Sequence, residues 1–120
     1  ANTNKDSLLQ IQADTKEQLN LLASQLLYIE AKGNYADFIY REGGELQHKL
    51  LRLSLADAKT QLDHPHIVQC HRSYLVNLAQ FDSLEGNAKK YELRSPWLPH
   101  GIPVSRSQGS TLKAHLKTLQ

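Results

Sequence analysis

The first half of the chain is a series of short apolar runs separated by turn-forming residues, which restricts it to short paired strands. Residues 35–40 (YADFIY) alternate in polarity, two glycines follow within 41–45 (REGGE), and 46–53 (LQHKLLRL) returns with a similar composition. Such runs on either side of a Gly-Gly turn predict a β-hairpin. Earlier runs of the same kind lie at 7–13, 18–23 and 25–31. About five strands are therefore expected before residue 54.

Two segments have helical spacing instead. The first follows Ser54, a good N-cap, and places three apolar residues on one helical face: Leu55, Ala58 and Leu62. The second follows Ser110, its expected N-cap, with three leucines on one face: Leu112, Leu116 and Leu119. Further strand-like runs lie at 66–71, 81–86, 89–95 and 101–105. The sequence therefore predicts a mainly β protein with two short helices.

The chain has 120 residues, of which 40% are apolar, and this suits one compact domain. Its apolar runs are too short to span a bilayer, and it has no signal-peptide pattern, so no membrane contact is expected. A single cysteine excludes an internal disulfide and favours a reducing compartment, so we expect a cytoplasmic protein. Residues 1–6 (ANTNKD) are interpreted as a linker or a cloning remnant, and residues 7–120 as the domain.

Charge is unevenly distributed along the chain. Residues 1–30 carry two lysines against four acidic residues, a balance of −2, whereas residues 70–120 carry seven lysines or arginines against three acidic residues, a balance of +4. An anionic partner would therefore dock on the C-terminal half. A solvated surface with uneven charge explains the same counts equally well.

The segment 64–71 (HPHIVQCH) collects four potential zinc ligands: His64, His66, Cys70 and His71. Structural zinc sites usually draw paired ligands from two separate knuckles, and here the ligand types lie along one expected strand, so no metal is predicted. Surface histidines beside a proline are the simpler interpretation. Cys70 and His71 are adjacent on that strand and point to opposite faces, so they cannot pair as nucleophile and base. Because the sequence also lacks the glycine motifs of hydrolases and nucleotide-binding enzymes, we expect neither an enzyme nor a cofactor.

Two hypotheses exist for Cys70. The thiol alternates with Val68 and so is interpreted as a small buried hydrophobe. The rival is a redox switch, because Arg72 and His71 could lower the pKa of the thiol.

The remaining chemistry is recognition of an anion. Basic residues stand at expected loops or element ends: Arg72, Lys89, Lys90 and Arg106. Such side chains bind phosphates, and arginine also reads guanine edges. Neutral hydrogen-bonding residues accompany them: Asn34, Tyr35, Ser73 and Ser107. Ordinary solvated strand ends are the alternative for each residue.

Four segments resemble the LytTR DNA-binding domains, which commonly form the output half of bacterial response regulators. The segments are LLYIEAKGNYADFIY, SLADAKTQL, QCHRSYLVNLAQFDSL and IPVSRSQGSTLKAHL. They keep the order and spacing of the family over roughly residues 8–119. The most specific parts are HRSYLVN at 71–77 and IPVSR at 102–106.

This resemblance implies an elongated arrangement of antiparallel β-sheets with two short helices. Loops would enter successive major grooves of double-stranded DNA at paired direct repeats. The resemblance implies DNA contacts by Asn34, Tyr35, Arg72, Arg106 and Ser107. The basic residues Lys32, Lys89 and Lys90 are expected to bind DNA as well. Two further residues would give structural support: His71 would hold Arg72 on an exposed loop, and Asn77 is expected to hydrogen-bond to local backbone groups. The family often carries a basic or aromatic residue within 107–109, so contacts there are the weakest part of the match, and Gly109 is expected to loosen the start of the helix.

The resemblance also implies a receiver or sensor domain upstream of this one. With no heptad and no long apolar stripe in the sequence, we expect a monomer that pairs on DNA. The alternative function is a β-rich protein-interaction or sensory domain that uses its basic face for an acidic partner. A linear fall of log affinity for DNA with log salt would separate the two, because neutralised phosphates release counterions.

Overall fold

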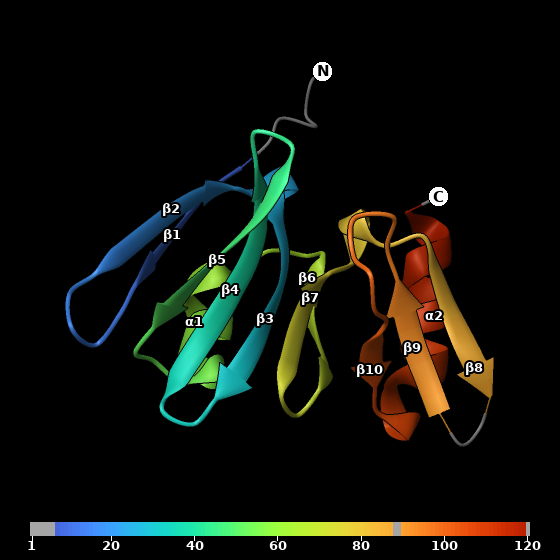
Figure 1. Cartoon of the computed structure of the whole chain (residues 1–120). Helices are drawn as coiled ribbons and strands as arrows, with labels where there is room; N and C mark the ends of the chain where they lie inside the picture. Colours follow the sequence, from blue (N-terminus) through green and yellow to red (C-terminus); the bar gives the residue numbers. More distant parts are fainter. Residues whose placement is uncertain (1–6, 88–89, 120) are drawn as a thin grey trace.

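The structure is a computed structural model and describes residues 7–87 and 90–119. It extends over 41 and 40 Å in two directions and 25 Å in the third (Figure 1). The strands are β1 (Leu8–Gln12), β2 (Gln18–Leu22), β3 (Leu26–Lys32), β4 (Tyr35–Glu42), β5 (Glu45–Leu51), β6 (Ile67–His71), β7 (Tyr74–Asn77), β8 (Ser83–Asn87), β9 (Lys90–Arg94) and β10 (Ile102–Val104). The helices are α1 (Leu55–Leu62), α2 (Gly109–Thr118) and the short 3-10 helices η1 (Ala23–Gln25), η2 (Leu78–Gln80) and η3 (Arg106–Gln108). The predicted mainly β fold with antiparallel sheets and two short α-helices is confirmed.

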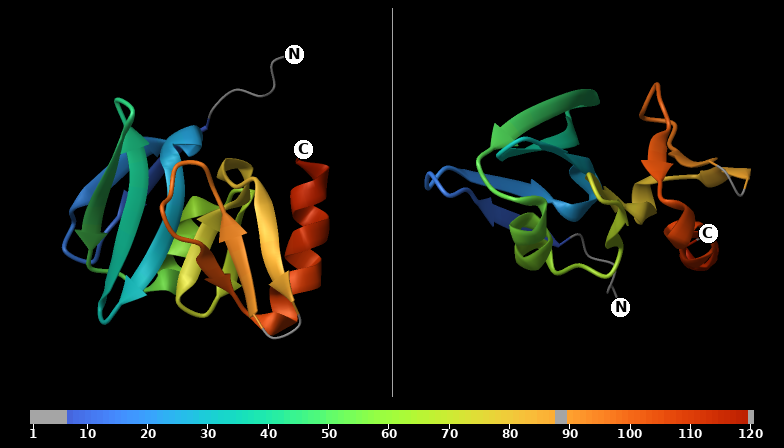
Figure 2. Two further views of the ribbon diagram at one scale, coloured as in Figure 1. Left: turned by 45° about the vertical axis from the view of Figure 1, so that its right-hand side comes forward. Right: turned by 90° about the horizontal axis from the view of Figure 1, so that it is seen from below.

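The central sheet has the strand order β5-β4-β3-β7-β6, and both of its faces take part in a core. Neighbouring residues of a strand point to opposite faces, yet Leu75 and Val76 of β7 are both fully buried. Leu75 packs with α1 and the β1-β2 hairpin, and Val76 packs with α2 and the β10-β9-β8 sheet. Seen from below, the two halves of the molecule lie on either side of β6 and β7 (Figure 2).

Helix α1 begins and packs as the sequence predicts. Ser54 Oγ accepts a hydrogen bond from the backbone N–H of Asp57 at 3.0 Å, which confirms the N-cap. The three apolar residues expected on one face are buried: Leu55, Ala58 and Leu62. This face packs on the central sheet with the β1-β2 hairpin and closes the core on that side, which we call the first core. The core on the other side, with α2 and the β10-β9-β8 sheet, is the second core.

A side chain of α1 also completes the edge of β1. Gln61 Nε2 donates to the carbonyl oxygen of Gln12 at 3.0 Å, and the N–H of Gln12 donates to Gln61 Oε1 at 2.7 Å. The carboxamide thus makes both of the hydrogen bonds that a neighbouring strand would make with this residue.

Helix α2 begins differently from the prediction. Its N-cap is Gln108, and Ser110 lies inside the first turn, so the predicted cap is wrong. The reason is that η3 leads directly into the helix, so the backbone is already helical at Gly109, where φ is −52°. Gly109 is buried, and a Cβ atom there would lie 2.5 Å from Cε2 of Tyr91. The absence of a side chain at Gly109 therefore lets the helix approach the Tyr91 ring.

The sequence predicts the strand at 66–71 but not the hairpin that it forms. Strand β6 turns back at Arg72 and Ser73 into β7, and Val68 pairs with Val76. This turn contains neither glycine nor asparagine, the residues that usually mark a two-residue hairpin, so the local pattern does not reveal it.

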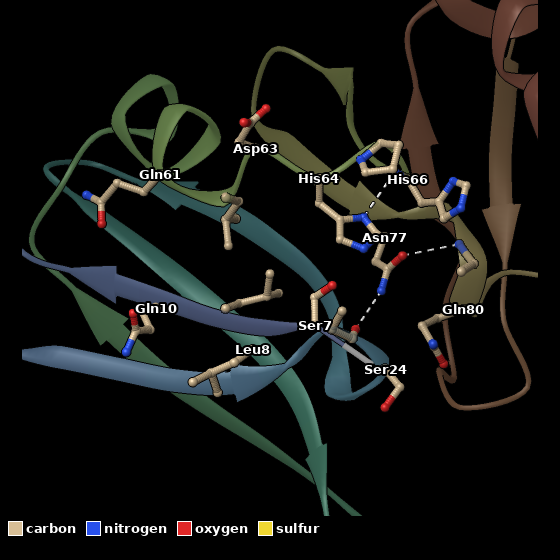
Figure 3. A pocket seen from close by; sticks show the side chains of 15 residues that line it. Ser7, Leu8, Gln10, Ser24, Gln61, Asp63, His64, His66, Asn77 and Gln80 are labelled. Atoms are coloured by element: carbon tan, nitrogen blue, oxygen red, sulfur yellow. Dashed lines mark hydrogen bonds between the residues drawn. The ribbon is translucent and has the colours of Figure 1, made fainter. Parts of the chain in front are cut away.

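Asn77, at the end of β7, joins this strand to η1 and β3. Its side chain is buried, and Nδ2 donates to the carbonyl oxygens of Ala23 at 2.8 Å and Leu26 at 3.1 Å. Its Oδ1 accepts from the N–H of Ala79 at 3.2 Å (Figure 3). The bond with Ala79 is the local kind that the sequence predicts, whereas the other two tie distant segments together.

We expect Asn77→Ala to lower the free energy of unfolding by about 2–4 kcal/mol, because it removes the three hydrogen bonds that this buried side chain makes. Urea denaturation followed by circular dichroism measures this change. Asn20→Ala, at an exposed position of β2, is the matched control and should change stability by less than about 0.5 kcal/mol. Equal losses in the two variants would contradict the assigned role of Asn77.

Candidate nucleic-acid interface

The first predicted contact region is the turn between β3 and β4. Gly33 has a φ of +61°, which glycine adopts without strain, and Gly33 and Asn34 connect the two strands. Asn34 is exposed, and Tyr35 keeps 43% of its surface exposed although it pairs with Lys32 in the ladder. The turn therefore presents an amide and a phenol to solvent.

Lys32, at the base of this turn, is engaged with an acidic side chain. Its Nζ lies 3.2 Å from Oδ2 of Asp37, whose side chain is 7% exposed, and His48 Nδ1 lies 3.1 Å from Oδ1 of the same carboxylate. The hydrogen bond with Asp37 raises the pKa of Lys32. Lys32 is thus held as the counter-ion of a buried carboxylate.

The second predicted contact region is the turn between β6 and β7. Its tip is Arg72, which is exposed and forms no ion pair with any residue that the structure describes. His71 Nδ1 accepts a hydrogen bond from the N–H of Ser73 at 3.2 Å, and its ring lies 5.7 Å from that of Tyr74. His71 therefore holds the turn from within, in keeping with the supporting role expected for it.

The third predicted contact region is η3. Arg106 and Ser107 are exposed there, and Ser107 Oγ lies 3.4 Å from Oγ of Ser105. Lys90 begins β9 at the same end of the C-terminal sheet, because Tyr91 pairs with Val104 just before η3. Its side chain is 78% exposed, and Nζ is 3.9 Å from Glu92 Oε2. The predicted contact Lys89 lies outside the described residues.

Two backbone hydrogen bonds fix these three regions relative to one another. The N–H of Ala31, next to Lys32, donates to the carbonyl oxygen of Ser73 at 2.8 Å. The N–H of Ser105, next to Arg106, donates to the carbonyl oxygen of Cys70 at 2.8 Å. All three regions lie along the lower edge of the molecule in Figure 1. We call this edge, defined by residues 32–35, 72–73 and 105–107, the contact edge.

Sequence reasoning missed Arg52, which lies beside the contact edge. The pairing of Ala36 with Leu51 brings Arg52 beside Tyr35, and the guanidinium carbon lies 5.9 Å from the centroid of the Tyr35 ring. The signal was present in the sequence, since counting outward from the predicted Gly43-Gly44 turn places residue 52 opposite residue 35.

The potential zinc ligands are spread apart by the fold. Cys70 is buried in the second core and His71 supports the contact edge, whereas His64 and His66 line a cavity of about 860 Å³ that opens beside η1 and η2 (Figure 3). Within the described ranges, no group of three or more His, Cys, Asp or Glu side chains is placed to hold a metal ion. This cavity lies at the end of β7 opposite the contact edge.

Cys70 has no solvent exposure, and its Sγ lies 3.5 Å from the carbonyl oxygen of Pro103. Burial raises the pKa of the thiol from its ordinary 9.0 to about 12. The geometry therefore favours the buried hydrophobe over the redox switch, since a reactive cysteine needs an accessible thiolate.

We expect native protein at pH 7.5 to resist thiol-specific labelling, and protein unfolded in urea to react at once. Stability should also fall as the pH rises from about 9 towards 12, because the unfolded thiol ionises in this window while the folded thiol stays protonated. Cys70→Ser, with no thiol to ionise, is the control for both measurements. Rapid labelling of the native protein would support the redox switch instead.

The fold and the contact edge define a mainly β domain whose exposed polar and cationic turns lie along one edge. The family described as LytTr DNA-binding domain matches residues 16–117, so the chain belongs to the LytTR DNA-binding domain family. The resemblance seen in the sequence is thereby confirmed. No helix among the described residues is long and apolar enough to cross a membrane.

Two relatives show how the chain compares with known proteins. It is 33% identical over 75 residues to an uncharacterized response regulatory protein of Vibrio cholerae serotype O1, and the match covers 62% of this chain and 29% of that protein. The chain thus spans less than a third of the relative. The fold is similar to the solved LytTr DNA-binding domain of a protein described as a methyl-accepting/DNA response regulator from Bacillus cereus. That match has a TM-score of 0.68 at 19% identity and covers 94% of this chain and 98% of the other.

Proposed function

We propose that this domain is the sequence-specific DNA-binding output domain of a transcriptional response regulator and that its contact edge docks on the duplex. The observation that carries the proposal is the pair of backbone hydrogen bonds, from Ala31 to Ser73 and from Ser105 to Cys70, that fix three exposed turns along one edge. Pre-positioned turns bind without the entropic cost of ordering them first.

The molecule is long enough to lie along one turn of the duplex. It extends over about 41 Å, and one turn of B-DNA advances about 34–36 Å, so a copy docked lengthwise would present its loops to successive major grooves. The central β6-β7 turn then faces the duplex between them. On paired direct repeats, two copies would bind in tandem.

The side chains at the edge divide into two kinds of contact. Arg72 projects from a turn braced by His71, so it is suited to a bidentate contact with a base edge. Arg106 with Ser107, and Asn34 with Tyr35, would supply the outer contacts. Lys90 is a mobile point charge suited to phosphate. We propose the same role for Lys89 from its charge and its place beside Lys90 in the sequence.

The response-regulator assignment rests on the two relatives, whose names describe response regulators. In the full-length protein a receiver or sensor domain would control when the contact edge meets DNA. Such a regulator would act in the cytoplasm, where the chromosome lies.

A binding-site selection on random duplexes, followed by titration at several salt concentrations, tests the proposal. We expect one enriched sequence and an affinity that falls linearly on a log–log salt plot. No enrichment, together with no salt-dependent binding, would favour the protein-interaction or sensory alternative.

Arg72→Ala should cost about 1–3 kcal/mol on the selected duplex and relax the preference at one or two base pairs, because a bidentate contact to a base is lost. Lys90→Ala should weaken selected and scrambled duplexes alike and lower the salt slope by about one. Both are read from the same titrations. An equal effect of Arg72→Ala on the two duplexes would contradict its role as the base-reading residue.

We expect the domain alone to be a monomer at micromolar concentration and to bind tandem repeats as two copies. The largest exposed apolar side chains lie in three separate places, namely on β1-β2, on β4-β5 and in the loop before β10, so the described residues offer no single continuous dimer face. Sedimentation velocity with and without a tandem duplex measures both states. A stable dimer without DNA would contradict this prediction.

A further inference from the structure

We propose that Arg52 is an additional DNA-contact residue, which binds a backbone phosphate beside the β3-β4 turn. The inference deepens the proposed function and rests on it. Beside the β3-β4 turn, the positive charge that binds DNA would then be that of Arg52, a residue that the family resemblance did not indicate.

The backbone of Arg52 is held from three sides. Leu51 before it and Leu53 after it are buried, and the N–H of Leu53 donates to the carbonyl oxygen of Leu51 at 3.0 Å. Arg52 is therefore the central residue of a tight three-residue turn. Its own carbonyl oxygen accepts a hydrogen bond from the N–H of Asp14 at 2.8 Å. The fixed backbone directs an exposed side chain outward at the end of β5.

Tyr35 gives the guanidinium a neighbour but not a counter-ion. The separation of 5.9 Å between the guanidinium carbon and the ring centroid is within the range of a cation–π contact. Such a contact limits the rotamers of Arg52 while leaving its N–H donors free. A planar fork held in this way suits two phosphate oxygens.

The other cations of β3, β4 and β5 are already engaged. Lys32 pairs with Asp37 at 3.2 Å, and Lys49 pairs with Glu17 at 3.6 Å. Arg41 donates to the carbonyl oxygen of Ser24 at 3.0 Å and its guanidinium lies 3.9 Å from the Trp97 ring centroid. Arg52, by contrast, forms no ion pair with any residue in the described ranges.

Transfer of Lys32 from Asp37 to a phosphate would be costly. The Asp37 carboxylate is buried and would lose its ammonium partner, which would leave only His48 Nδ1 against it, and removing one partner of a buried charge is unfavourable. Arg52 can bind a phosphate without breaking an existing ion pair. The net electrostatic gain on binding DNA should therefore come from Arg52 more than from Lys32.

The test compares Arg52→Gln with Lys117→Gln. Both variants lose one positive charge. Lys117 serves as the control because it is exposed in the last turn of α2, at the end of that helix remote from the contact edge (Figure 1). Arg52→Gln should lower the log–log salt slope by about 0.9 and reduce affinity roughly 5- to 10-fold near 0.1 M salt, on selected and scrambled duplexes alike. Lys117→Gln should leave the slope within about 0.2 of wild type.

Two further variants sharpen the result. Arg52→Lys should keep most of the salt slope and lose part of the affinity, because the charge remains and the fork does not. Lys32→Gln should change the slope by less than half as much as Arg52→Gln. Thermal unfolding of each variant without DNA shows whether a loss of affinity is a loss of folded protein, and affinities are then compared per folded molecule.

A salt slope for Arg52→Gln equal to that for Lys117→Gln would overturn the inference, and so would a larger change for Lys32→Gln than for Arg52→Gln. In either case wild-type binding to the selected duplex, and its loss in Arg72→Ala, would leave the proposed function intact. If the wild-type protein does not bind DNA at all, the proposed function fails first.

Discussion

The burial of β7 on both faces is the constraint on which the rest of this molecule depends. Leu75 and Val76 must each find apolar cover on opposite sides of the sheet, so the chain builds one core mainly from the segments before this strand and another mainly from the segments after it. The two cores meet at the central sheet, and Asn77 ties the end of β7 remote from the contact edge to η1 and β3. Because β7 also hydrogen-bonds to β3 and β6, the β3-β4 and β6-β7 turns beside the start of β7 cannot move independently.

This arrangement explains why turns, and not a helix, form the proposed interface. Both α-helices use their apolar faces to close a core, α1 on the first and α2 on the second. The strands end together at one edge, where short connections leave side chains exposed on a rigid base. A binding surface of this kind gains its geometry from the sheet and its chemistry from a few residues at strand ends.

Features set by local chemistry could be predicted from the sequence, and features set by distant partners could not. The N-cap at Ser54 and the Gly43-Gly44 turn depend on a few neighbouring residues, and the burial of Cys70 was expected from the alternation of side chains along its own strand. The β6-β7 hairpin was missed because its turn carries no glycine or asparagine, and the start of α2 was misplaced because η3 continues into it. The ion pair between Lys32 and Asp37 depends on the tertiary structure, since nothing in the sequence shows that Asp37 is buried beside Lys32. Arg52 could have been found, but only by extending the hairpin register beyond the last paired residue.

The carboxamide of Gln61 against Gln12 has a consequence for how copies of this protein meet one another. The segment 8–12 contains neither charge nor proline, the usual devices that prevent an edge strand from recruiting a strand of another molecule. One glutamine from α1 instead saturates the main chain at the end of that edge, and an invading strand would have to displace it before pairing there. Helix α1 thus protects β1 against intermolecular strand pairing. Strand β1 therefore needs no charged residue or proline of its own and can keep its apolar residues for the core.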